Sequence, residues 1–124
     1  MKALSTTAAP AAIGPYSQAI MAGDTVYVSG QLPINPSTSE FAEGGIKEQA
    51  RQSLNNIKNI LAEAGMTMQQ VVKVTVLMTD MSDFAAVNEV YAEFFSAPYP
   101  ARSAFAVAAL PKGGAIEIEA VAVK

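Results

Sequence analysis

The segment PARSAFAVAALPKGGAIEIEAVAV, residues 100–123, constrains the fold most, because two apolar runs of strand-forming residues hold charged residues at fixed positions. The runs are typical of two β-strands joined by a Pro-Lys-Gly-Gly turn. Arg102 opens the first strand, and Glu117 and Glu119 lie two residues apart in the second. Since side chains on a strand alternate between faces, both acids share one face. Val121 and Val123 lie on that face too, and the opposite face holds Ile116, Ile118, Ala120 and Ala122. We interpret the rest of the chain as a scaffold that holds Arg102 and Glu117 near one cavity.

The composition predicts one folded domain, residues 1–124. Hydrophobic residues make up 51% of the chain and charged residues 15%, a balance that favours folding over disorder. This apolar share is high for a small monomer, and burying one face against another subunit would use the surplus.

Charge and residue types exclude several kinds of chemistry. The net charge is −3 and no basic cluster is present, so nucleic acid is not an expected partner. The chain has no Cys and no His, which removes disulfides, thiolate catalysis, the usual triads and the usual zinc ligands. It also has no Gly-rich phosphate loop and no metal-ligand cluster. We therefore expect no metal site.

The N-terminal sequence MKALSTTAAPAA lacks the apolar core of a secretory signal peptide. No apolar run approaches the roughly 20 residues that a membrane span requires. These observations predict a soluble, cytoplasmic protein that is not bound to a membrane.

Hydrophobic periodicity predicts the remaining elements. Two β-rich runs within residues 18–29 flank Ala-Gly-Asp and indicate a hairpin, and a short edge strand could precede them. Apolar residues at steps of three or four predict a helix over residues 45–65 that ends at Gly65. We expect residues 31–43 to form a loop.

A strand and a second helix follow. The strand covers residues 71–79, with Val72, Val74, Val76 and Met78 predicted to face the helices. Ser82 is the predicted N-cap of a helix over residues 83–95. The fold class is therefore α+β, a mixed sheet with two helices packed on one face. The other face, which would hold Glu117 and Glu119, suggests an oligomer interface lined by a polar pocket.

Arg102 and Glu117 are the candidate functional residues. The planar guanidinium of Arg102 suits a carboxylate or phosphate ligand, although spacing alone favours a structural ion pair with Glu117 or another local acid. Glu117 is a candidate general base; burial would raise its pKa and a nearby arginine would lower it. The alternation rule does not separate Glu117 from Glu119. Tyr16 could simply cover a core edge, and Asn88 could be a solvated amide.

Five sequence blocks in order make the chain resemble the RidA/YjgF family of enamine/imine deaminases over nearly its whole length. They are IGPYSQA (13–19), VSGQLPINP (28–36), EQARQSLNNIKNILAEAG (48–65), VVKVTVLMTDMSDFAAVNEVYAEFF (71–95) and YPARS with LPKGGAIEIEAVAV (99–103 and 110–123). Each block is modest alone, but the five together are highly specific.

The resemblance implies a chorismate-mutase-like fold and a homotrimer with a central barrel and three clefts between subunits. It implies hydrolytic deamination of 2-aminoacrylate-type enamines, through imines such as 2-iminopropanoate and 2-iminobutanoate, to 2-keto acids and ammonia. It implies no cofactor. Such imines are released by pyridoxal-phosphate-dependent dehydratases.

The resemblance also implies roles for particular residues. Arg102 would grip the substrate carboxylate, and Glu117 would orient or activate the attacking water. The pocket lining would comprise Tyr16, Ser29, Gly30, Asn88 and the backbone at Ala104.

This sequence departs from the family pattern near Arg102. Ala104 replaces a cysteine that many members have, Ala109 replaces an arginine, and the loop at residues 96–99 is shorter. Substrate preference is therefore open. Two other functions remain as alternatives: a non-catalytic trimeric binder or sensor of small 2-keto acids, and an endoribonuclease or translation inhibitor, which the acidic balance disfavours.

Overall fold

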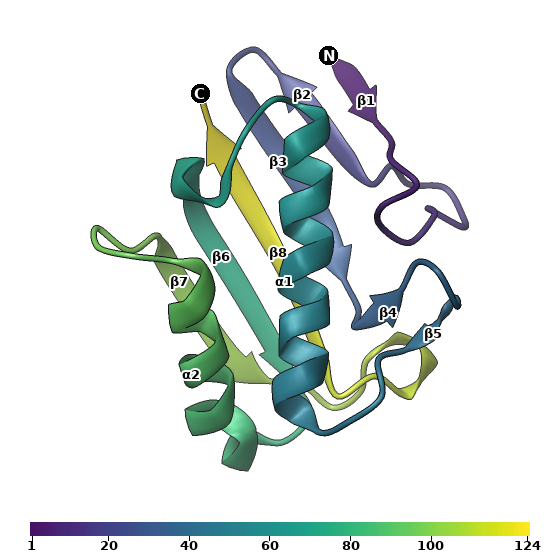
Figure 1. Cartoon of the computed structure of the whole chain (residues 1–124), viewed down its shortest axis with the longest axis vertical. Coiled ribbons are helices and arrows are strands. Elements are labelled where there is room, and N and C mark those ends of the chain that lie inside the picture. Colours follow the sequence, from purple (N-terminus) through teal and green to yellow (C-terminus); the bar gives the residue numbers. More distant parts are fainter.

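The computed structural model describes residues 1–124 and contains a six-stranded mixed sheet. The strands lie in the order β1-β2-β3-β8-β6-β7 (Figure 1). Neighbours pair antiparallel except β6 and β7, which are parallel. The bounds are β1 Lys2–Leu4, β2 Ala19–Ala22, β3 Thr25–Gln31, β6 Val71–Met78, β7 Ala101–Ala106 and β8 Ile116–Val123. The predicted mixed sheet, hairpin and short edge strand are confirmed.

Two helices, α1 (Ile46–Glu63) and α2 (Phe84–Phe94), cover one face of this sheet (Figure 1). The apolar stripe of α1 packs on β3 and β8, and its central residues Leu54, Ile57, Ile60 and Leu61 are fully buried. Gly65, at φ +71°, takes the left-handed conformation that commonly ends a helix. The outer surfaces of the helices are joined by ion pairs, Arg51 with Glu93 at 2.8 Å and Lys47 with Glu89. The predicted two-helix layer is confirmed.

Strand β8 lies at the centre of the sheet and alternates as predicted. Ile116, Ile118 and Ala122 are buried against the helices, whereas Glu117 and Glu119 lie on the opposite, open face. Large hydrophobic side chains are exposed on that face, including Tyr27 and Phe105. Between β3, β8 and β6 it has a shallow hollow of about 140 Å³ lined partly by Lys73, Thr75 and Glu119. The open face is therefore half apolar and half polar.

One prediction about the strands is wrong, and their order adds a feature that was not predicted. Val72 does not face the helices: the register between β6 and β8 shifts between Val71 and Lys73, so Val71 is buried and Val72 is exposed. The strands β7 and β8 are not neighbours, because β6 lies between them. Pro111–Gly113 forms a short 3-10 helix, η3, within the connection from β7 to β8. Local sequence patterns do not report which strands pair across a crossover.

Two local predictions are also corrected. Ser82 is not the N-cap of α2; it lies inside the 3-10 turn η2 (Met81–Asp83), and its N–H donates to the side chain of Asp80. Residues 31–43 are not wholly irregular, since β4 (Ile34–Asn35) pairs with β5 (Glu40–Phe41). A third 3-10 turn, η1 (Met68–Gln70), precedes β6. None of the helices is long and apolar enough to cross a bilayer.

Candidate functional site

Arg102 lies near the start of β7, and its side chain extends over the helix-covered face toward α2. It is opposite Val74 of β6, which is fully buried. The Nη1 group of Arg102 donates a hydrogen bond of 2.8 Å to Oδ1 of Asn88. Its guanidinium carbon lies 4.7 Å from the ring centroid of Tyr91 and 5.3 Å from that of Phe84. We call Arg102, Asn88, Tyr91 and Phe84 the arginine group.

No carboxylate forms an ion pair with Arg102. The three ion pairs of the chain all involve Lys47 or Arg51 on α1. A structural salt bridge between Arg102 and Glu117 is therefore absent from this chain. The half-buried guanidinium keeps an unneutralised positive charge, which favours an anionic ligand.

Glu117 lies on the open face of β8, opposite Leu77 of β6. The register of β3 against β8 shifts between Val28 and Gln31, and this bulge contains Gly30. A Cβ atom on Gly30 would lie only 2.8 Å from Cδ of Glu117, so glycine makes room for the carboxyl group. Burial raises the pKa of Glu117, and the nearby charge of Glu119 raises it further.

Ser29 joins the segment that follows Tyr16 to this bulge. Its hydroxyl donates to the carbonyl of Ser17 at 2.6 Å, and its N–H donates to the carbonyl of Gln18 at 2.9 Å. Tyr16 is 53% exposed, and its N–H donates to the carbonyl of Gly14. We call Tyr16, Ser29, Gly30 and Glu117 the glutamate group, because Ser29 bonds to the segment after Tyr16 and the adjacent Gly30 lies against Glu117.

The structure does not bring the two groups together within one chain. Glu117 pairs with Leu77 on the open face, whereas Arg102 pairs with Val74 on the helix-covered face. Ala104 lies two residues after Arg102, on the same face of β7, and packs partly against the core. The expectation of a single cavity that holds Arg102 and Glu117 is therefore not met by one chain.

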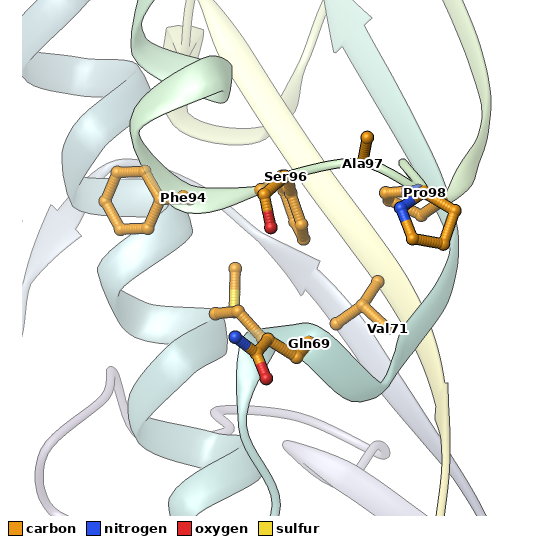
Figure 2. Close-up of a pocket in the computed structure, with 9 residues that line it drawn as sticks. Gln69, Val71, Phe94, Ser96, Ala97 and Pro98 are labelled. Atoms are coloured by element: carbon orange, nitrogen blue, oxygen red, sulfur yellow. The ribbon is translucent and has the colours of Figure 1, made fainter.

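A cavity lies away from both groups. It has a volume of about 330 Å³ and is bounded by η1, the start of β6 and the segment that links α2 to β7 (Figure 2). Gln69, Phe94 and Pro98 are among its lining residues, and none of the predicted site residues lines it. No cluster of three or more acidic side chains is placed to hold a metal ion.

Sequence reasoning missed three residues that organise these groups. Phe84 and Tyr91 are spaced from Asn88 so that all three lie on one face of α2. An arginine that opens the next strand was the available signal for a contact with that face. Gln18 is buried and binds the carbonyls of Thr6 and Pro10, which fixes the N-terminal loop. No sequence pattern distinguishes this glutamine from an exposed one.

Comparison with known proteins shows the family to which the chain belongs. The family described as Endoribonuclease L-PSP matches residues 6–124. A goat (Capra hircus) protein named 2-iminobutanoate/2-iminopropanoate deaminase is 54% identical over 98% of this chain and 88% of its own length. The crystal structure of RidA from the Antarctic bacterium Psychrobacter sp. PAMC 21119 is 52% identical, covers 100% of both chains and has a TM-score of 0.96.

A second solved relative carries a ligand. The crystal structure of E. coli TdcF with bound serine is 46% identical, has a TM-score of 0.96 and covers 100% of this chain and 99% of its own. The matches extend over the arginine group and the glutamate group alike, since they span almost the entire sequence. This chain therefore belongs to the RidA/YjgF family, whose profile, sequence relatives and fold it shares.

Proposed function

We propose that this protein is a 2-iminobutanoate/2-iminopropanoate deaminase, a hydrolase that converts reactive 2-imino acids to 2-keto acids and ammonia. Relatives that are 50–54% identical over almost the whole chain bear this name. The observation that supports it most strongly is Arg102, a half-buried guanidinium that has no acidic partner. A substrate with a carboxylate next to its reacting carbon suits such a group. Bound serine in TdcF has a carboxylate in the same relation to its nitrogen.

The proposed chemistry needs one group that binds the substrate carboxylate and one group that transfers a proton. Arg102 holds the substrate carboxylate by charge-assisted hydrogen bonds, which orients the imine carbon. Glu117 accepts a proton from the attacking water and returns it to the nitrogen. Water adds across the C=N bond to give a carbinolamine; its hydroxyl proton then passes to the nitrogen as the C–N bond breaks, and ammonia and the keto acid leave. Burial favours this role, because a raised pKa makes the carboxylate of Glu117 a stronger base.

The complete site, in this proposal, forms between subunits of a homotrimer with a central barrel. Arg102 and Glu117 lie on opposite faces of one sheet, so a single chain does not complete it. The open face has the apolar and polar mixture of a subunit interface, with Tyr27 and Phe105 exposed. The arginine group of one subunit would then face the glutamate group of the next, with Tyr16, Ser29, Gly30, Asn88 and the backbone of Ala104 lining the cleft.

A coupled assay tests the activity. A serine dehydratase generates 2-iminopropanoate, semicarbazide traps the imine that remains free, and the trapped product is followed with and without this protein. We expect wild type to accelerate imine loss. Arg102→Ala should remove the acceleration, because losing two charge-assisted hydrogen bonds costs roughly 3 kcal/mol or more, a factor above a hundred. Arg102→Ala with wild-type rates would exclude Arg102 from the site.

Subunit mixing tests the shared site. Arg102→Ala and Glu117→Gln chains are unfolded together, refolded as mixed trimers and assayed. In a ring of randomly mixed subunits about a quarter of the clefts pair an intact Arg102 with an intact Glu117, so about a quarter of the activity should return. No recovery in mixed trimers would contradict a site built from two chains.

The alternative function is a trimeric binder of 2-keto acids. Measuring binding and turnover in Glu117→Gln distinguishes it from a deaminase. Both functions predict that this variant still binds 2-oxobutanoate through Arg102. Only an enzyme loses turnover at the same time. Retained binding with no acceleration by wild type would favour the binder.

A further inference from the structure

We propose that Phe84 and Tyr91 are positioning residues that hold the guanidinium of Arg102 in a fixed orientation for its ligand. The proposal rests on the proposed function in taking a small carboxylate as that ligand. It goes further in assigning a task to two aromatic residues of α2 that are not among the site residues implied by the family resemblance.

The arrangement follows from helix geometry. Phe84, Asn88 and Tyr91 are spaced four and three residues apart, so they lie in a row along one face of α2. The outer two are separated by about 10.5 Å along the helix axis. The guanidinium carbon of Arg102 lies 5.3 Å from one ring centroid and 4.7 Å from the other. Arg102 therefore meets α2 between these two turns, at the level of Asn88.

The three contacts use different parts of the guanidinium. The two rings attract its positive charge through their π-faces. Asn88 accepts one hydrogen bond from Nη1, and neither Nη2 nor Nε has an acceptor in the chain. The edge formed by Nη2 and Nε is thus left for a carboxylate, which matches its two parallel donors.

Tyr91 is suited to this task by its ring rather than by its hydroxyl. The ring of Tyr91 also packs against the ring of Phe95, with 4.5 Å between their centroids. The hydroxyl is buried and has no hydrogen-bond partner. Burial raises the pKa of Tyr91, so the phenol stays neutral beside Arg102. A leucine would fill the core here, but it would offer no π-face to a cation.

Fixing Arg102 before the ligand arrives should strengthen binding. Arginine has several rotatable bonds, and β7 is an edge strand that pairs only with β6. A free side chain there would lose rotamer entropy on gripping a ligand, whereas a held one has already lost it. The effect should therefore appear in ligand affinity and KM more than in kcat.

The test compares Tyr91→Leu and Phe84→Leu with Phe94→Leu, a matched change on the same helix at a ring that makes no cation–π contact with Arg102. Calorimetry measures the dissociation constant of 2-oxobutanoate, and the coupled assay measures kcat and KM. We expect each of the first two variants to weaken binding about fivefold or more. Phe94→Leu should bind as wild type does. Tyr91→Phe, which restores the ring, should recover the affinity that Tyr91→Leu loses.

Nuclear magnetic resonance of the arginine Nε–H groups provides a readout that needs neither turnover nor ligand. The Arg102 signal, assigned by its loss in Arg102→Lys, should show restricted motion in wild type and in Tyr91→Phe. It should become mobile in folded Tyr91→Leu. A mobile signal in wild type, or equal loss of affinity in all three leucine variants, would overturn the proposal. Acceleration by wild type with no change in Tyr91→Leu would leave the deaminase function intact and refute only the positioning role.

Discussion

Placing a negative charge at residue 88 should block the anion site while leaving the fold in place. In wild type the neutral Oδ1 of Asn88 accepts from Arg102 at 2.8 Å. Asn88→Asp keeps the shape of the side chain and converts this contact to an ion pair. Arg102 would then hold a carboxylate of its own chain, and the local charge would fall from positive to neutral.

The magnitude follows from the short distance. A carboxylate ligand on the free edge of Arg102 would lie roughly 5 Å from the new charge, and their repulsion at an effective dielectric constant of about 20 is about 3 kcal/mol. Solvent at this half-buried position reduces that figure, so we expect affinity for 2-oxobutanoate to fall roughly 10- to 100-fold. The thermal midpoint should stay the same or rise.

Calorimetric titration with 2-oxobutanoate measures the effect, and the coupled imine assay should show a matching loss in kcat/KM. Asn55→Asp is the control, because it makes the same chemical change on α1, away from Arg102. Wild-type affinity in folded Asn88→Asp would refute the reasoning, since an anion bound by Arg102 cannot be indifferent to a carboxylate in contact with the same guanidinium.

Three further substitutions test other parts of the structure. Because burial raises the pKa of Glu117, the folded state binds its proton more tightly than the unfolded state does; this group therefore favours folding most below the ordinary glutamate range, and its contribution falls as pH rises through the raised pKa. Thermal-unfolding curves recorded from about pH 4 to pH 8 should show this loss of stability with rising pH in wild type and not in Glu117→Gln. If the variant loses stability over the same range as wild type does, Glu117 is not the source of the loss. Gly30→Ala would place a Cβ atom 2.8 Å from Cδ of Glu117 and displace the carboxyl group, so kcat should drop roughly tenfold or more with little loss of stability. Gly45→Ala, where no atom lies within 4 Å of the added carbon, should keep wild-type kcat, and equal rates in the two variants would contradict the close approach. Ser53 is fully buried on α1 and its hydroxyl has no partner, so Ser53→Ala should raise the free energy of unfolding by about 1 kcal/mol in urea titrations; a decrease would reveal an acceptor or a packing contact that the hydroxyl satisfies.

Patterns that depend on one element were predictable from the sequence. The alternation of β8 placed Ile116 and Ile118 inside and Glu117 outside, and the period of α1 placed its buried stripe correctly. Both predictions rest on side-chain geometry that is the same wherever the element sits. The hairpin of β2 and β3 was likewise indicated by its short turn.

Patterns that depend on how elements meet were not predictable. The parallel pairing of β6 with β7 separates β7 from β8, and no residue of the intervening turn encodes that separation. The register shift after Val71 reversed the expected direction of Val72. The same limit affected the site: Arg102 and Glu117 were each identifiable, but their placement on opposite faces follows from strand order and register.

The separation of Arg102 and Glu117 by the thickness of a sheet has a consequence for how this protein would be measured. On the proposal that the site spans two subunits, a correctly folded single chain contains every required residue and is nevertheless inactive. Specific activity would then depend on protein concentration, falling on dilution as subunits dissociate and returning when the sample is concentrated. Turnover per chain would thus serve as a sensitive measure of assembly. If turnover per chain stays constant at concentrations where sedimentation detects only monomers, one chain is sufficient for activity.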